Sequence, residues 1–143
     1  HEVGDQTLKR FGTLLVSAFP LEGFIARIAA DSFAAIVPVE VPLEPALQAL
    51  HRQLERNLPV GEHLVPISVT AGIARFPEHG EASALFRNAG MALKQAKRQQ
   101  RGGHQSFDDR FEQDLRQRLE LVRELRSPAG QAALRLMYQP QRQ

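Results

Sequence analysis

The sequence predicts an α+β fold in which helices flank a mainly antiparallel central sheet. Helical and strand-like patterns alternate along residues 1–107 in the order helix, strand, strand, helix, strand, helix, strand. Two neighbouring apolar runs separated by a tight polar turn predict a β-hairpin within that order. The 143 residues are enough for one domain with one core, so a second domain could only be partial.

The first helix is expected between Gly4 and Phe19, with Asp5 as its cap and Pro20 as its stop. Its apolar positions follow three-and-four spacing: Leu8, Phe11, Leu14, Leu15 and Ala18. The apolar runs at 24–28 and 33–37 then form the hairpin strands, with their turn between them.

The middle of the chain predicts one helix and one longer strand. The pattern of residues 44–57 is helical, and Leu47, Leu50 and Leu54 mark the face that it buries. Residues 58–61 contain proline and glycine and are expected to end this helix. Residues 64–76 alternate loosely as a strand, which the turn residues 77–80 close.

Two further helices are expected in the C-terminal part. The first covers residues 82–101 and ends at Gly102-Gly103, before a short strand at 105–107. The second starts at Asp108-Asp109 and runs to Arg126. Its apolar stripe is narrow, as in a connector that packs on a neighbour, and consists of Phe111, Leu115, Leu119 and Val122. A strand begins near 134–138 and has no sheet of its own to join.

Composition excludes several classes of protein. Cysteine is absent, which excludes disulfides and thiolate chemistry and fits the cytoplasm. No apolar run approaches the ~20 residues needed to span a bilayer, so no membrane contact is expected within this chain. The net charge is only +2, and the clustered cations are too few for a nucleic-acid footprint. The five histidines lack metal-ligand spacing.

Four segments together resemble the motifs of one family. Residues 1–5 (HEVGD) resemble a GHxxGD segment, residues 69–74 (VTAGIA) an SxGIA strand, and residues 88–97 (NAGMALKQAK) an NADxALYxAK helix. The hairpin turn reads Ala29-Ala30-Asp31-Ser32-Phe33 where that family has Gly-Gly-Asp/Glu-Glu-Phe. The family is that of the GGDEF domains, the bacterial diguanylate cyclases, which have a nucleotidyl-cyclase-like fold.

The segment after this domain resembles the start of an EAL domain, a cyclic-di-GMP phosphodiesterase or receptor. Residues 108–141 are similar to the helical linker and first strand of that domain. The resemblance therefore divides the chain into a degenerate GGDEF domain at 1–107, an inter-domain linker helix at 108–133 and the first strand of a truncated EAL domain at 134–143.

The resemblance implies that the cyclase reaction is lost. In an active cyclase of this family two domains face each other, and each holds one GTP and two divalent metals. Ser32 replaces the family carboxylate, and its neutral hydroxyl neither neutralises a metal nor acts as a base at pH 7. Ala29 and Ala30 replace glycines that allow positive φ, so either the turn changes shape or nucleotide contact weakens. No catalytic residue is therefore expected.

Some family ligands survive in the matching positions. Asp31 corresponds to a metal-binding residue, Asp5 to the aspartate that reads guanine, and Lys97 and Arg101 to cations that meet the terminal phosphates from one helix face. Each also has a purely structural interpretation, as a helix cap, a turn former or C-terminal helix cations. The resemblance thus implies no required cofactor, with GTP and Mg²⁺ as weak ligands at most.

Two departures from the family pattern concern its other sites. The product-inhibition motif RxxD reads Pro20-Leu21-Glu22-Gly23 here, so no cyclic-di-GMP site is expected before the turn. The family's first strand, which belongs at the centre of the sheet, would lie before His1 and is absent from this chain.

The resemblance implies a regulatory or dimerisation module without enzymatic activity that belongs to a cyclic-di-GMP signalling protein. Its expected partners are an attached EAL domain and a second copy, and any phosphodiesterase activity would belong to the parent protein. The first alternative is a GTP-binding allosteric module that activates the attached phosphodiesterase. The second is a diguanylate cyclase that survives on an unconventional site.

Overall fold

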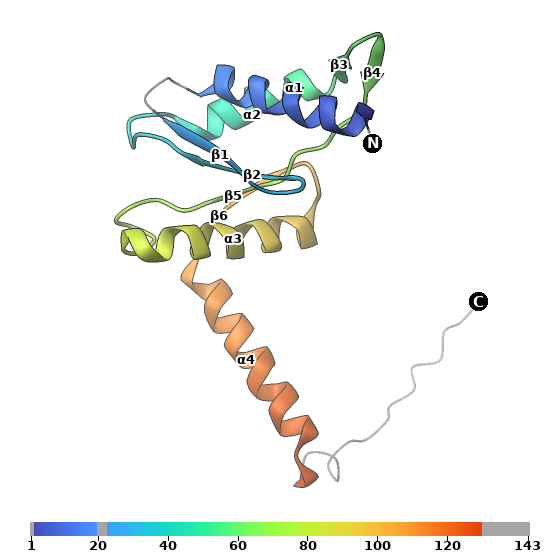
Figure 1. The fold of residues 1–143 in the computed structure, drawn as a ribbon. Coiled ribbons are helices and arrows are strands. Elements are labelled where there is room, and N and C mark those ends of the chain that lie inside the picture. The colour runs from blue at the N-terminus through green and yellow to red at the C-terminus, as the bar shows by residue number, and fades with distance from the viewer. Residues whose placement is uncertain (1, 20–22, 130–143) are drawn as a thin grey trace, which may run out of the picture. The chain divides into compact units, whose positions relative to one another are not determined.

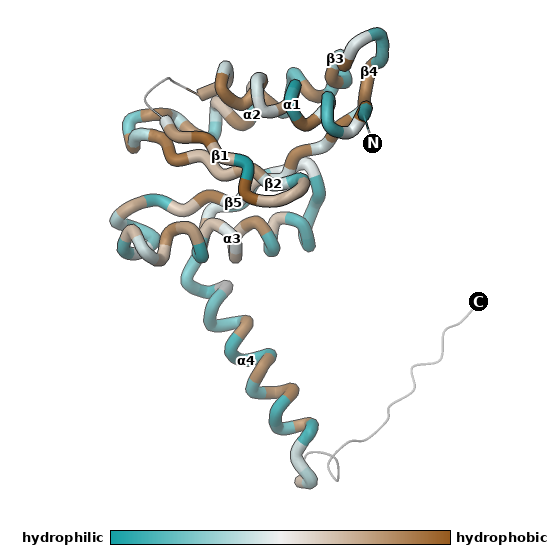
Figure 2. The backbone as a smooth tube through the Cα atoms, viewed as in Figure 1, coloured by the Kyte–Doolittle hydropathy of each residue, from teal (hydrophilic) through white to brown (hydrophobic). Residues whose placement is uncertain are grey.

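The computed structural model describes residues 2–19 and 23–129. The chain divides into two compact units, His1–Phe107 and Asp108–Gln143. In the first unit, strands β1 (Phe24–Ala29), β2 (Ser32–Ile36), β5 (Ala71–Ile73) and β6 (His104–Ser106) lie between two helix layers (Figure 1). Helices α1 (Glu2–Ala18) and α2 (Leu43–Leu54) form one layer and helix α3 (Ala82–Gln99) the other. Figure 2 shows that apolar residues recur along these helices and strands.

Helix α1 (Glu2–Ala18) confirms the first helical pattern and buries Phe11 and Leu15. It begins earlier than expected, because Glu2 and Asp5 both lie in its first turn. The prediction of Asp5 as the cap is therefore wrong. An acidic side chain in this position interacts favourably with the helix dipole instead.

Strands β1 (Phe24–Ala29) and β2 (Ser32–Ile36) form the predicted antiparallel hairpin. Phe33 on β2 packs edge-on against Phe11 of α1, with ring centroids 5.3 Å apart. This contact fixes the hairpin against the first helix and leaves its turn at the surface.

Helix α2 (Leu43–Leu54) buries the three predicted leucines, Leu47, Leu50 and Leu54, but ends before residue 57. Asn57 takes a left-handed conformation with φ of 63°, which stops the helix. The chain then makes a second hairpin from β3 (Leu58–Val60) and β4 (His63–Val65). The predicted breaker at 58–61 is thus largely a strand, because Leu58 and Val60 bury their side chains while Gly61, with φ of 59°, makes the turn.

The expected long strand at 64–76 is wrong as a single element. It consists of β4 and of β5 (Ala71–Ile73), which pairs in parallel with β6 (His104–Ser106). Ile67 and Val69 between them still pack against the core, as their alternation predicts. The Nε2 atom of His51 makes a 3.0 Å hydrogen bond with the Val69 carbonyl oxygen. A side chain, rather than a neighbouring strand, is therefore the hydrogen-bond partner of this carbonyl.

Helix α3 (Ala82–Gln99) confirms the third helical pattern and lies directly on β5. A Cβ atom at Gly72 would lie 2.2 Å from the Ala89 carbonyl oxygen and 2.3 Å from the Leu93 nitrogen. Only glycine allows this approach. Ala92 and Ala96 are buried in the same layer, so small residues on both elements set the distance between helix and strand.

The α+β class is confirmed, whereas one continuous antiparallel sheet is not observed in residues 2–19 and 23–129. The strands make three pairs, β1–β2 and β3–β4 antiparallel and β5–β6 parallel. One apolar core joins α1, α2, the β3 strand and β5. Tertiary packing rather than a common hydrogen-bonded ladder therefore connects the pairs.

The second unit contains helix α4 (Asp109–Arg126), as predicted. The Asp108 carboxylate caps it by accepting a 2.9 Å hydrogen bond from the Arg110 backbone nitrogen. Glu112 and Arg116 form an ion pair of 3.0 Å one turn apart. The strand expected at 134–138 lies outside the described residues. None of the described helices is long and apolar enough to span a bilayer.

Candidate functional site

The candidate site is the turn between β1 and β2. Arg27 pairs with Phe33 and Ala29 pairs with Ser32, and the register shifts between these two pairs. Ala30 and Asp31 make the two-residue connection, and both are exposed. The sequence therefore placed this turn correctly at the tip of a hairpin.

The two alanines keep an unstrained backbone. Among the described residues, Asn57 is the one non-glycine residue with a positive φ. Ala29, Ala30 and Asp31 thus avoid the left-handed conformation, in which a Cβ atom costs about 1 kcal/mol or more. The turn therefore accommodates both alanines without the strain that a positive φ would impose.

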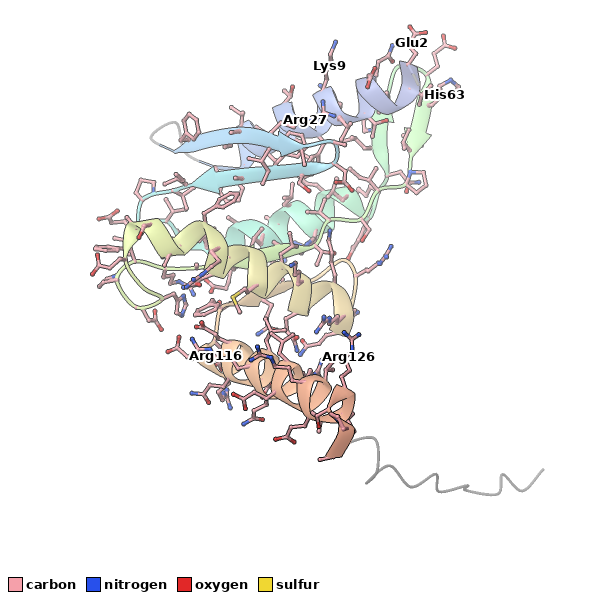
Figure 3. The ribbon with its side chains drawn as sticks, turned by 60° about the horizontal axis from the view of Figure 1, so that its bottom comes forward. Glu2, Lys9, Arg27, His63, Arg116 and Arg126 are labelled. Atoms are coloured by element: carbon pink, nitrogen blue, oxygen red, sulfur yellow. The ribbon has the colours of Figure 1, made fainter. Side chains whose placement is uncertain are left out.

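The Arg27 side chain closes over this turn. Its Nε and Nη2 donate hydrogen bonds of 3.3 Å and 2.6 Å to the carbonyl oxygens of Ala29 and Ala30. Figure 3 shows Arg27 beside the hairpin, projecting from β1. The turn carbonyls are therefore bonded to the chain's own guanidinium.

Asp31 and Ser32 supply the polar side chains of the tip. The Ser32 hydroxyl donates a 3.2 Å hydrogen bond to Oδ1 of Asp31. A site for Mg²⁺ normally has several oxygen ligands, often from more than one carboxylate when it lies at phosphates. Within residues 2–19 and 23–129 no three His, Cys, Asp or Glu side chains lie close enough together to hold a metal ion. Asp31 therefore belongs to no such cluster in the described part of the chain.

The other predicted ligand residues lie on separate elements. Asp5 is exposed on α1 and Lys97 is exposed on α3. Arg101 is exposed in the turn after α3, because the helix ends at Gln99. The expectation that Lys97 and Arg101 share one helix face is therefore wrong. In the described part of the chain, no hydrogen bond or ion pair joins any of the three to the hairpin.

A polar cluster that the sequence did not indicate joins α2 to β6. Arg75, just after β5, pairs with the Glu44 carboxylate and donates a 3.1 Å hydrogen bond to the Ser106 hydroxyl. The hydrogen bond from Arg75 lowers the pKa of Glu44. Glu44 and Arg75 lie 31 positions apart, so no local spacing could have revealed the pair.

The structural role of Asn88, which belongs to the motif on α3, was also not predicted from the sequence. This side chain is buried, and its Nδ2 donates a 2.8 Å hydrogen bond to the His79 carbonyl. The His79 Nδ1 in turn accepts a 2.9 Å hydrogen bond from the Arg75 backbone nitrogen. Asn88 therefore stabilises the loop between β5 and α3, and its side chain is not exposed to solvent.

An open pocket lies between α1 and the β3–β4 hairpin. Its lining includes two cations, Lys9 and Arg10, with Gln6 and Thr13 on the same helix. Asp5 is not part of this lining. The predicted guanine-reading residue thus lies outside this pocket. Most of the RxxD segment, residues 20–22, lies outside the described residues.

Comparison with known proteins decides the family. The model of the family described as "Diguanylate cyclase, GGDEF domain" matches residues 1–103. The chain belongs to the GGDEF domain family. This GGDEF domain superimposes on the solved GGDEF domain of TpbB from Pseudomonas aeruginosa with a TM-score of 0.75 and 26% identity, covering 81% of this chain and 70% of that one.

Curated relatives extend the similarity to α4. MucR of Pseudomonas aeruginosa, a bifunctional diguanylate cyclase/cyclic di-GMP phosphodiesterase, is 29% identical over 98% of this chain and 21% of its own length. NbdA of the same organism, a cyclic di-GMP phosphodiesterase, is 28% identical over 98% of this chain and 18% of its own length. The chain thus spans about a fifth of these cyclic-di-GMP signalling proteins.

Proposed function

We propose that this chain is a catalytically inactive GGDEF domain that acts as a regulatory and dimerisation module of a cyclic-di-GMP signalling protein. The observation that carries the proposal is the turn at Ala29–Phe33. It has one carboxylate, a neutral Ser32 in place of the second, and carbonyls bonded to Arg27.

The chemistry of phosphoryl transfer explains why this turn is unsuitable. Such catalysis depends on positioning and on metal ions that neutralise charge at the phosphates. Asp31 alone provides one charged ligand group, and the Ser32 hydroxyl provides no negative charge. Metal, nucleotide and attacking hydroxyl would then lack the electrostatic support that usually gives the largest part of the acceleration.

The attached partner is an EAL domain of the parent protein. MucR and NbdA, whose names include cyclic-di-GMP phosphodiesterase activity, match 98% of this chain, and that share includes α4. Phosphodiesterase activity belongs in this proposal to the parent, and α4 connects it to the silent domain. Both domains would then work in the cytoplasm.

Product formation tests the loss of cyclase activity. The chain is incubated with GTP and Mg²⁺ at high protein concentration, and cyclic-di-GMP is measured by mass spectrometry. We expect none above the level of the Asp31→Asn variant, which removes the remaining carboxylate of the turn. Turnover that exceeds this control by tenfold or more would refute the proposal.

A second candidate function is a GTP-binding allosteric module, because Lys97 and Arg101 are exposed and have no ion pair within the described residues. Calorimetric titration with GTP and Mg²⁺ separates it from a scaffold. Saturable heat that Lys97→Ala weakens, and that Lys94→Ala one turn earlier on α3 leaves unchanged, would favour this second function. Absence of heat favours the scaffold.

A further inference from the structure

Helix α4 carries an apolar stripe that is exposed in the structure. Leu115, Leu119 and Val122 lie three or four positions apart and thus on one side of the helix, and all three are exposed. Leu125 continues the stripe by one more turn and is exposed as well. Side chains of this kind arranged along a helix are typical of a surface that packs on another helix.

The charges of α4 are divided between its two ends. Residues 109–114 contain three carboxylates and one guanidinium, whereas residues 115–126 contain four guanidinium groups and two carboxylates. The helix therefore has a negative N-terminal part and a positive C-terminal part. Two copies side by side attract each other when they run in opposite directions and repel each other when they run in the same direction.

We infer that α4 pairs with α4 of a second copy of this chain, in antiparallel orientation. The apolar stripe supplies the buried area, and the opposite charges of the helix ends set the direction. The stripe on α4 would be the surface through which the proposed dimerisation module forms its dimer. The inference rests on the proposed function only for this dimerisation role. Catalytic inactivity is independent of it.

Side-chain positions at the edge of the stripe make the direction testable. Glu112 and Arg123 are eleven residues apart and lie along the same edge of the helix, because eleven residues complete about three turns. In an antiparallel pair, same-edge positions of the two copies face each other. Glu112 of one copy then lies near Arg123 of the other, and this contact occurs twice in the dimer.

Oligomeric state is the first measurement, made on the full chain by sedimentation velocity over a range of concentrations. Leu119 is 58% exposed and belongs to the stripe, whereas Gln117 is exposed on the opposite side of the helix. We expect Leu119→Glu to weaken dimerisation at least tenfold and Gln117→Glu to leave it within twofold of the unchanged chain. A monomeric unchanged chain, or equal effects of both variants, would overturn the inference.

Charge reversal tests the orientation. Arg123→Glu alone should weaken the dimer, and adding Glu112→Arg should restore it, because each ion pair is rebuilt with its signs exchanged. The gain should shrink in 1 M NaCl, where the Debye length falls to about 3 Å. A double variant that dimerises no better than Arg123→Glu would exclude the antiparallel arrangement.

The absence of cysteine allows a direct check. Chains with Glu112→Cys and chains with Arg123→Cys are mixed and treated with a short thiol-reactive cross-linker. An antiparallel pair gives mainly the mixed product, whereas a parallel pair gives each chain linked to its own kind and would contradict the inference. Neither result depends on GTP turnover, so a failure here is distinguishable from a failure of catalytic inactivity.

Discussion

The turn at Ala29–Phe33 and the contact of β5 with α3 are both motif regions of this GGDEF domain, yet they differ in burial and in the kind of residue kept. At the contact, Gly72 allows a backbone approach that no Cβ atom would permit, and Asn88 and Ala92 are buried. At the turn, alanines stand where the family motif has glycines, Ala30 and Asp31 are exposed, and the polar groups are bonded to one another. The motif residues at the contact are thus packing residues, whereas the turn is a polar surface segment that the proposed function interprets as unable to support the reaction.

The largest expected effect is at Gly72. Replacing it with alanine places a Cβ atom 2.2 Å from the Ala89 carbonyl oxygen, so helix and strand must separate. We expect Gly72→Ala to lower the free energy of unfolding by about 3 kcal/mol. Gly90→Ala on the same helix is the control, since a Cβ there meets no atom within 4 Å, and it should be neutral or stabilising. Urea denaturation of both variants tests this, and equal stabilities would contradict the packing account.

Asn88 should have the next largest effect. Asn88→Ala leaves the His79 carbonyl without its 2.8 Å donor inside the structure and should cost about 2 kcal/mol of unfolding free energy. Gln99→Ala, at an exposed position on α3, is the control and should change stability by less than about 0.5 kcal/mol. If Asn88→Ala lowered the free energy of unfolding by less than about 0.5 kcal/mol, the hydrogen bond to His79 would not be an important contribution to stability.

A smaller effect is expected from pH at Glu44. Its pKa is lowered in the folded chain by the hydrogen bond from Arg75, so it binds fewer protons than in the unfolded chain. The resulting stability is present above the unfolded-state pKa and is lost as pH falls through the folded-state pKa. Because the Glu44 side chain is 43% exposed, solvent limits the effect to about 0.5 kcal/mol.

Thermal unfolding between pH 3 and pH 7 measures this contribution. Glu44→Gln should be less stable than the unchanged chain at pH 7, and the difference should vanish at the acidic end. The control is Glu55→Gln, at an exposed position just after α2 with no ion pair among the described residues. A constant difference for Glu44→Gln across the pH range would exclude the ion pair as its cause.

An equally small effect is expected at the turn itself. Arg27→Ala removes two exposed hydrogen bonds to the Ala29 and Ala30 carbonyls and should lower the free energy of unfolding by about 0.5 kcal/mol. Chemical denaturation detects such a change only with replicate curves. A loss of more than about 2 kcal/mol in the free energy of unfolding would mean that the turn contributes to stability almost as much as the Gly72 contact. The distinction between a packing region and an exposed turn would then be wrong.

Local pattern predicted the helices and the first hairpin, because their signals lie within a few residues of one another. The apolar spacing of α1, α2 and α3 and the tight turn after β1 are of this kind. The β3–β4 hairpin was missed because Pro59 and Gly61 indicated a breaker, while the burial of Leu58 and Val60 depends on distant parts of the core. Residues 66–70 alternate like a strand but belong to no ladder in the described structure.

The candidate site was predicted in position but not in detail. The register of the turn follows from the two flanking apolar runs, whereas the closure by Arg27 depends on a side-chain conformation that sequence does not determine. Arg101 was assigned to α3 because the helical pattern continues to it, although the helix ends at Gln99. The Glu44–Arg75 pair depends on the tertiary fold and had no signal in the sequence.

Metal binding at the turn tests the central claim most directly. In ¹⁵N NMR spectra of the chain with GTP and substoichiometric Mn²⁺, paramagnetic broadening reports which amides lie near a bound metal. The account predicts that the amides of Ala30, Asp31 and Ser32 broaden no more than that of the exposed Glu40. Saturable, GTP-dependent broadening confined to the turn would show a metal–nucleotide site at Ser32 and would contradict catalytic silence.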